Sequence, residues 1–300
     1  MLSIKLIHEM ASKSSNFAVV TGGMFFLSFI ALSFWVGTIV NSRFAEELLQ
    51  GGNAKYTNQD YKGAIADYTE VIRLKPDSAE AYNKRGIAKF QLRDYRGAIE
   101  DFNQAIRIEP NSAEAYNNRG RVRFELGDIQ GASADFNQAI RRQPDFAEAY
   151  FHSGNVKYKA GDNEGAIADF NQAIRFNPDL AAAYEKRGRA RAELGNKQGA
   201  VDDFNQAIRL QPNNSYLYWL RGALRDELGN KQGAIEDYTR VIRLQPDFAE
   251  AFYRRGVIRQ QRNERQEALV DLRKAAELFE QQGNTEWYAR SQDKIKKLGG

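Results

Sequence analysis

The stretch AIADFNQAIR occupies residues 166–175, and the chain repeats nearly the same ten letters on either side of it. ASADFNQAIR begins 34 residues earlier and AVDDFNQAIR begins 34 residues later. Catalysis needs a few unusual residues that converge on one point, whereas a fixed step in the sequence produces many equivalent points along a line. The repetition therefore indicates an array of similar structural units.

Proline and glycine follow the same step of 34 residues through most of the chain. The six prolines stand at 76, 110, 144, 178, 212 and 246, and the glycines of this register are Gly52, Gly86, Gly120, Gly154, Gly188, Gly222 and Gly256. Each unit holds two amphipathic runs with helical spacing, such as AEAYNKRGIAKFQL (79–92) and RGAIEDFNQAIRI (96–108). We expect a helical hairpin per unit, with Asp94 capping the second helix and Asp77 with Glu80 forming a capping box on the first.

These units resemble tetratricopeptide repeats (TPR), whose signature reads aromatic, glycine, alanine, aromatic, alanine and proline. In residues 79–112 these positions are Tyr82, Gly86, Ala98, Phe102, Ala105 and Pro110. The resemblance implies an all-α solenoid of seven hairpins stacked into a right-handed superhelix, with the first helices lining a concave groove that binds other proteins. The seven repeats are 45–78, 79–112, 113–146, 147–180, 181–214, 215–248 and 249–282, and residues 283–300 are expected to form a C-terminal cap helix.

The N-terminal part of the chain differs from the repeats. Residues 17–40 contain no charged side chain, and a helix of that length spans a bilayer core of about 30 Å. We expect residues 1–16 to be a tail and 17–40 a single transmembrane helix, because the apolar run is longer than that of a cleaved signal peptide. Lys5 and Lys13 favour a cytoplasmic N-terminus, although the charge difference across the segment is small.

Composition narrows the function. The chain has no cysteine, two histidines and a net charge of +4. Residues 1–44 hold three basic side chains against one acidic side chain, so the remainder is nearly neutral and a nucleic-acid partner is not expected. No metalloprotease, phosphate-loop or dinucleotide motif occurs, so we expect no enzyme, no catalytic residue, no metal and no cofactor. His152 is expected to be a surface residue.

Two positions of the first helix are basic in most repeats, and an aspartate recurs at a fixed position of the second helix. The seventh position holds Arg85, Arg119, Arg187, Arg221 and Arg255; the eleventh holds Lys55, Lys89, Arg123, Lys157, Arg191, Arg225 and Arg259; the acids are Asp67, Asp101, Asp135, Asp169, Asp203, Asp237 and Asp271. This register predicts an ion-pair ladder inside the hairpins. The alternative is a basic track for an acidic partner.

The candidate partner-binding residues lie at positions five, nine and twelve of the repeats, which share one face of the first helix. They are Tyr56, Phe90, Asn117, Arg121, Phe124, Phe151, Asn155, Tyr158, Arg189, Trp219 and Tyr253. Tyr56, Phe90, Phe124 and Tyr158 form an aromatic stripe at the twelfth position. Packing between repeats is the competing interpretation of that stripe.

The sequence thus predicts a membrane-anchored scaffold that binds another protein in its groove. The DFNQAIRLQP style of repeat (203–212) is similar to that of membrane-bound TPR proteins of cyanobacteria and plastids. That similarity implies a thylakoid or plasma membrane location and a role in the assembly of a photosynthetic complex or in pigment synthesis. The alternative function is a structural homo-oligomer that uses the repeat surface for self-association.

Overall fold

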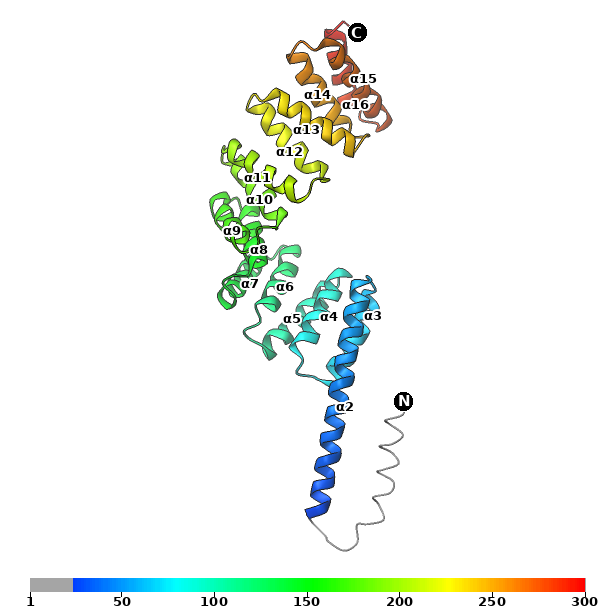
Figure 1. Cartoon of the computed structure of the whole chain (residues 1–300), viewed down its shortest axis with the longest axis vertical. Helices are drawn as coiled ribbons and strands as arrows, with labels where there is room; N and C mark the ends of the chain where they lie inside the picture. The colour runs from blue at the N-terminus through cyan, green and yellow to red at the C-terminus, as the bar shows by residue number, and fades with distance from the viewer. Residues whose placement is uncertain (1–23, 300) are drawn as a thin grey trace. The chain divides into compact units, whose positions relative to one another are not determined.

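The computed structural model describes residues 24–299, with side chains from residue 41 onward. These residues form fifteen α-helices, and no strand occurs among them (Figure 1). The expected all-α class is therefore confirmed. The chain divides into two compact units, one ending at Asn111 and the other beginning at Ser112, and each is described by itself.

The first unit contains four helices that pack in chain order, each against the next. They are α2 (Met24–Thr57), α3 (Tyr61–Leu74), α4 (Ala79–Gln91) and α5 (Tyr95–Ile108). Figure 1 shows α2 as the longest of them, with only its C-terminal part packed beside α3 and α4. The unit therefore holds the two N-terminal hairpins, α2–α3 and α4–α5.

The expected separation between a membrane helix and the first repeat is not observed, because α2 runs without interruption from Met24 to Thr57. Residues 41–44 contain neither proline nor glycine, so nothing there ends a helix. Of the predicted membrane segment 17–40, residues 17–23 lie outside the described residues, and the side chains of the remainder do too. Within the part of the chain that is described, no helix combines the length and the apolar character needed to cross a membrane.

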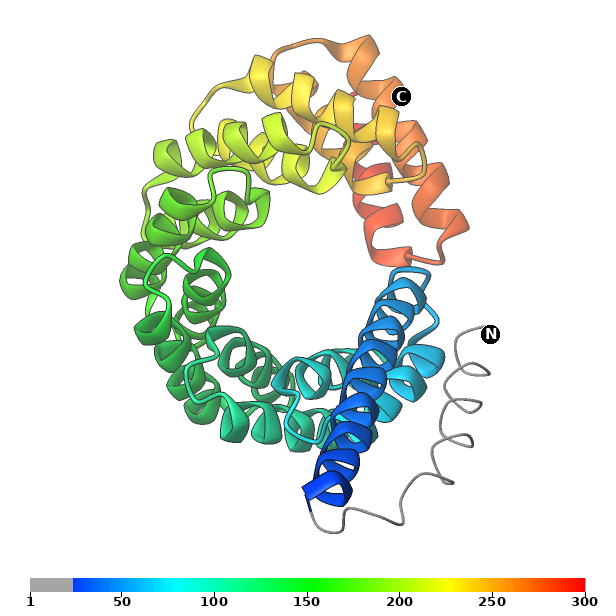
Figure 2. The same ribbon diagram turned by 60° about the horizontal axis from the view of Figure 1, so that its bottom comes forward.

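The second unit contains eleven helices arranged as hairpins with a final single helix. They are α6 (Ala113–Glu125), α7 (Ile129–Arg142), α8 (Ala147–Lys159), α9 (Asn163–Phe176), α10 (Ala181–Glu193), α11 (Lys197–Leu210), α12 (Ser215–Glu227), α13 (Lys231–Leu244), α14 (Ala249–Gln261), α15 (Arg265–Gln281) and α16 (Thr285–Lys297). The first helix α8 also contacts the first helices α6 and α10, so these three helices lie in a row along one side of this unit. Figure 2 shows its hairpins side by side in two rows.

The opening stretch AIADFNQAIR forms most of α9 and supplies its buried face. Ala166, Phe170 and Ala173 are all fully buried. A β-carbon at Gly154 of α8 would lie 2.6 Å from the Phe170 ring, which is closer than atoms can approach. The glycine therefore lets the aromatic ring pack directly on the backbone of the first helix, and this contact sets how closely the two helices of the hairpin approach.

The start of each second helix explains a further glycine of the repeat. Asp162 caps α9 by accepting a hydrogen bond from the backbone N–H of Gly165 at 2.9 Å. A β-carbon at Gly165 would lie 2.1 Å from that carboxylate. Asp94 caps α5 in the same way, as expected. The expected role of Asp77 is wrong, because the neighbouring Ser78 accepts from the Ala81 N–H and so caps α4.

The predicted ion-pair ladder is confirmed by its geometry. Asp203 is buried and accepts from Nε and Nη2 of Arg187, the latter at 2.5 Å, and from Nη1 of Arg191 at 2.9 Å. The same cluster of one aspartate and two cations forms at Asp101, Asp135, Asp237 and Asp271. In these five clusters every cation bonds the buried aspartate and is at most 27% exposed, which favours a structural ladder over a basic track.

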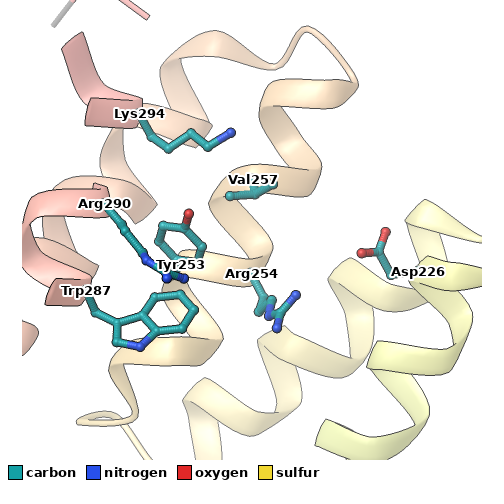
Figure 3. Close-up of a pocket in the computed structure, with 7 residues that line it drawn as sticks. All are labelled: Asp226, Tyr253, Arg254, Val257, Trp287, Arg290 and Lys294. Atoms are coloured by element: carbon teal, nitrogen blue, oxygen red, sulfur yellow. The ribbon is translucent and has the colours of Figure 1, made fainter. Parts of the chain in front are cut away.

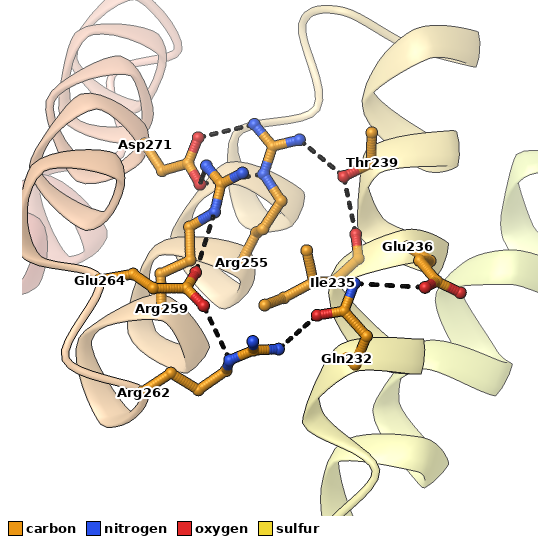
Figure 4. Close-up of polar contacts among 9 residues, drawn as sticks. All are labelled: Gln232, Ile235, Glu236, Thr239, Arg255, Arg259, Arg262, Glu264 and Asp271. Carbon is orange, nitrogen blue, oxygen red and sulfur yellow. Dashed lines mark hydrogen bonds and ion pairs between the residues drawn. The ribbon is translucent and has the colours of Figure 1, made fainter.

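The seventh-position arginine also joins neighbouring hairpins. Arg255 donates to both oxygens of Asp271 in its own hairpin and, through Nη1, to Thr239 Oγ1 of α13 at 2.9 Å (Figure 4). Arg187 reaches Asn171 of α9 in the same manner at 2.6 Å. Arg85 and Arg221 make the same kind of contact, so these four arginines fix the two helices of one hairpin and the second helix of the hairpin before it.

The ladder is shorter in two repeats. The seventh position is Gly51 in the first repeat, where Lys55 alone binds Asp67, and Ser153 in the fourth. Ser153 donates to Asp169 at 2.6 Å and Lys157 binds the same carboxylate at 2.7 Å. The partner of Asp169 is therefore not Arg187, which belongs to Asp203.

Replacing Asp203 by alanine should destabilise the protein by about 3–5 kcal/mol, because it leaves two arginines of a buried cluster without their acid. Asp169→Ala should cost about 1–3 kcal/mol, since it leaves one lysine and one serine hydroxyl unpaired. The neighbouring exposed Asp202→Ala is the control and should change stability by less than about 0.5 kcal/mol. Urea denaturation followed by circular dichroism measures all three, and equal losses for Asp203→Ala and Asp202→Ala would contradict the ladder.

Gly165→Ala tests the cap. Alanine normally stabilises a helix interior by about 1 kcal/mol relative to glycine, but here its methyl group displaces the capping Asp162 carboxylate, which costs a similar amount. The expected net change is close to zero. In an Asp162→Ala background the same substitution should stabilise by about 1 kcal/mol. Thermal melts of the native chain, the two single variants and the double variant give the coupling energy between Gly165 and Asp162. Additive effects of the two substitutions would show that the glycine has another role.

Candidate binding surface

The first helices of the second unit carry most of the predicted binding residues. Asn117 and Arg121 lie on α6, Phe151 and Asn155 on α8, and Arg189 on α10. Asn117 is buried and the other four are half-buried. Since α8 contacts both α6 and α10, the residues are spread along one row of first helices. We call it the first-helix face.

Two polar atoms on this face have no hydrogen-bond partner in the described part of the chain. Asn117 Oδ1 and Arg189 Nε are both buried from solvent and unpaired. An unpaired buried polar atom costs about 1–3 kcal/mol. The face therefore contains one acceptor and one donor whose hydrogen bonds are not made within the protein.

The structure gives Tyr158 and Arg189 separate sets of polar contacts, Tyr158 with α10 and Arg189 with α10 and α12. Tyr158 Oη donates to Glu193, which also accepts from Asn163 Nδ2 at 3.0 Å. Burial, followed by the bond to Glu193, raises the pKa of Tyr158 to about 12. Arg189 bonds Glu185 at 2.9 Å and Tyr216 Oη at 2.5 Å. Both predicted residues are thus held in place by neighbouring repeats.

The aromatic stripe packs at the hairpin turns. Tyr56 lies edge-on to Tyr61 at 5.3 Å and Phe90 lies 5.8 Å from Tyr95, both in the first unit. In the second unit Phe124 packs against the core cluster of Ala132, Phe136 and Val156. All four rings of the stripe remain half-buried. These contacts favour the packing interpretation, while binding of a partner by the stripe stays a prediction.

His152, which was expected at the surface, is half-buried and packs against two aromatic rings. Its ring stacks on Phe136 of α7 at 5.5 Å and lies edge-on to Phe151 at 5.3 Å. Burial, with a smaller contribution from the Arg121 charge, lowers the pKa of His152 to about 3. The imidazole is therefore neutral at pH 7 and serves the contact between the third and fourth hairpins. Within the described residues, no cluster of histidine and acidic side chains suited to a metal ion occurs.

The other predicted aromatic residues pack toward the C-terminal end of the second unit. Trp219 lies 5.3 Å from Tyr238 and 5.1 Å from Phe248. Tyr253 lies edge-on to Trp287 of the cap helix at 5.1 Å. Tyr253 is thereby placed at the wall of a cavity, whereas Trp219 packs against α13 and the start of α14.

That cavity has a volume of about 260 Å³ and lies among α12, α14 and α16 (Figure 3). Its walls carry three cations, Arg254, Arg290 and Lys294, and one acid, Asp226. Tyr253, Val257 and Trp287 supply the apolar part. We call this site the C-terminal pocket.

Sequence reasoning identified only Tyr253 of this pocket. Trp287, Arg290 and Lys294 follow one another at helical spacing, so they share one side of the cap helix. That spacing was the available signal. The pairing of this side with Arg254 depends on how α16 packs against the last hairpin, which the sequence does not specify.

The fold defines a helical-hairpin repeat protein whose first helices carry the candidate binding residues. Three tetratricopeptide repeat models match the chain, one at 52–93 and 154–195, one at 84–146 and 219–284, and one at 181–214. The chain therefore belongs to the tetratricopeptide repeat family. No curated protein sequence matches it.

Several solved structures have a similar fold. PilF of Pseudomonas aeruginosa is 15% identical, with 69% of this chain and 94% of that one covered at a TM-score of 0.63. PilW, described as a widely conserved type IV pilus biogenesis factor, is 23% identical, with 67% and 94% covered at 0.61. YrrB, described as a TPR protein with an unusual peptide-binding site, is 20% identical, with 61% and 95% covered at 0.52. At these sequence identities the similarity shows that the folds are alike and nothing about function.

His152 should make the protein sensitive to mild acid. Its pKa is about 3 in the folded protein and about 6.5 when unfolded, so the unfolded chain binds the extra proton first. The stability that depends on neutral His152 is complete above pH 6.5 and is lost as the pH falls toward 3. At pH 5 the loss should be about 2 kcal/mol.

Urea midpoints at pH 7 and pH 5 for the native chain and for His152→Asn measure this effect. The only other histidine is His8, so the difference between the two proteins isolates His152. The variant should lose less stability between the two pH values. An identical loss in both proteins would mean that His152 is accessible to protons in the folded state.

Proposed function

We propose that this protein is an interaction scaffold that holds a segment of another protein on the first-helix face. Membership of the TPR family supports this, as does the similarity of fold to YrrB, which is described as having a peptide-binding site. The near-neutral charge of the repeats favours a polypeptide over nucleic acid. A homo-oligomer that uses the same face is the alternative.

The unpaired atoms of Asn117 and Arg189 carry the proposal. A peptide backbone offers N–H donors and C=O acceptors along its whole length. Both atoms are closed to water in this conformation, so a bound segment reaches them once the two side chains turn outward. The segment then donates to Asn117 Oδ1 and accepts from Arg189 Nε, which removes the cost of leaving both atoms unpaired. The half-buried Phe151 lies on the helix between them and offers apolar contact area.

We further propose that residues 17–40 anchor the scaffold in a membrane, with the N-terminus on the cytoplasmic side. The uncharged sequence supports an anchor, and α2 continues from Met24 into the first hairpin without a break. A scaffold tied in this way would hold its partner close to the bilayer. Assembly of a membrane complex, photosynthetic if the similarity to cyanobacterial and plastid proteins holds, is the process that such an arrangement suits.

Site-specific photo-crosslinking of the full chain in its native membranes tests the binding face. p-Benzoylphenylalanine is placed at Asn155, on the first-helix face, and in a control protein at Val270, which is exposed on the second helix α15. We expect ultraviolet light to produce a discrete adduct with another protein from position 155 and none from position 270. Adducts at position 270 alone, or equal adducts at both, would refute the assignment, and an adduct of twice the chain mass would indicate the homo-oligomer.

A further inference from the structure

The C-terminal pocket differs in charge from the rest of the repeat array. In the ladder, each cation at the seventh or eleventh position of a first helix forms an ion pair with an aspartate. In the pocket, Arg254 and Lys294 have no ion-pair partner among the residues with described side chains. The one acid of the pocket, Asp226, is bound by Lys231 at 2.5 Å. The pocket therefore has an excess of positive charge that the protein itself does not neutralise.

The third cation is held over an aromatic ring. The guanidinium carbon of Arg290 lies 4.8 Å from the centroid of Trp287, and the side chain also bonds the exposed Glu286 at 2.7 Å. Trp287 is in turn fixed between Tyr253, at 5.1 Å, and Phe279, at 5.7 Å. Figure 3 shows cations projecting from both α14 and α16 around Tyr253 and Val257. The arrangement thus combines packed apolar walls with positively charged side-chain ends.

From this arrangement we infer that the C-terminal pocket binds an acidic segment of a partner protein, with an apolar side chain in the cavity and flanking carboxylates on Arg254, Arg290 and Lys294. The volume of about 260 Å³ is below the roughly 300–1,000 Å³ of sites for drug-sized ligands, so it suits one large side chain of a peptide. Three cations from two helices exceed what a single terminal carboxylate requires, which favours side-chain carboxylates.

The N-terminal segment of this chain is a poor occupant, because residues 1–16 carry two lysines and one glutamate. The inference rests on the proposed scaffold function and specifies its partner: the segment bound at the end of the array is acidic. The first-helix face has its own unpaired groups, so the two sites can be tested separately.

The test uses the full chain in a neutral detergent and a fluorescein-labelled, C-terminally amidated peptide in which one phenylalanine is flanked on each side by two glutamates. Fluorescence anisotropy gives the Kd. Arg254→Glu combined with Lys294→Glu should raise the Kd about tenfold or more, because attraction becomes repulsion. Arg273→Glu combined with Lys296→Glu is the matched control, since both residues are exposed, lie on α15 and α16 outside the pocket and change the net charge equally.

The control variant should bind within about twofold of the native chain, as expected for screened surface charges. A peptide with glutamines in place of the glutamates should bind at least about tenfold more weakly. Circular dichroism melts confirm that the variants fold, and Arg254→Gln with Lys294→Gln provides a milder second variant that should also weaken binding.

Three outcomes would overturn the inference: equal affinity of the pocket variant and the control variant, equal affinity of the acidic and glutamine peptides, or full displacement by millimolar inorganic phosphate, which would indicate a general anion site. Tighter binding of the free-acid peptide that no longer depends on its glutamates would assign the pocket to a chain terminus instead. If crosslinks at position 155 persist in the Arg254→Glu, Lys294→Glu protein, the scaffold function stands even when the inference fails.

Discussion

One buried aspartate in each second helix determines how the hairpins of this protein are joined. Moving a carboxylate out of water is costly unless charged and hydrogen-bonding partners replace the water. Asp203 obtains those partners from Arg187 and Arg191 of the first helix, and Arg187 uses its remaining nitrogen to reach Asn171 in the preceding hairpin. The same requirement therefore fixes the hairpin internally and relative to its neighbour.

The ladder also determines which charges remain for function. Because the seventh-position arginines are largely buried and bonded to aspartates, they are occupied within the fold and contribute little exposed positive charge along the array. Charges outside the ladder register, such as Arg254 and Lys294, are the ones available to a ligand. In a repeat protein, departures from the repeating pattern are thus more informative about binding than the pattern itself.

The repeating part of the structure could be predicted from the sequence because each element there is set by local contacts that recur seven times. The hairpins, the Asp94 type of cap and the ladder all follow from spacing within one unit. The need for glycine at Gly165 could not be predicted from the sequence. A β-carbon at that position would lie 2.1 Å from the Asp162 carboxylate, and this distance depends on the folded backbone. His152 was misplaced because its burial comes from Phe136 in the adjacent hairpin. The C-terminal pocket likewise needs three helices to be in position at once.

The fourth repeat has a consequence for how the second unit deforms. With Ser153 at the seventh position, no arginine extends from α8 to the second helix before it, and the stacked rings of His152 and Phe136 take over that junction. Aromatic stacking tolerates sliding and tilting better than a pair of directional charged hydrogen bonds. The junction between α7 and α8 is therefore the one in the second unit that rests on stacked rings, whereas the later junctions are bridged by Arg187, Arg221 and Arg255. Because the stack requires an uncharged imidazole, protonation of His152 weakens this junction and leaves the arginine-bridged ones unchanged.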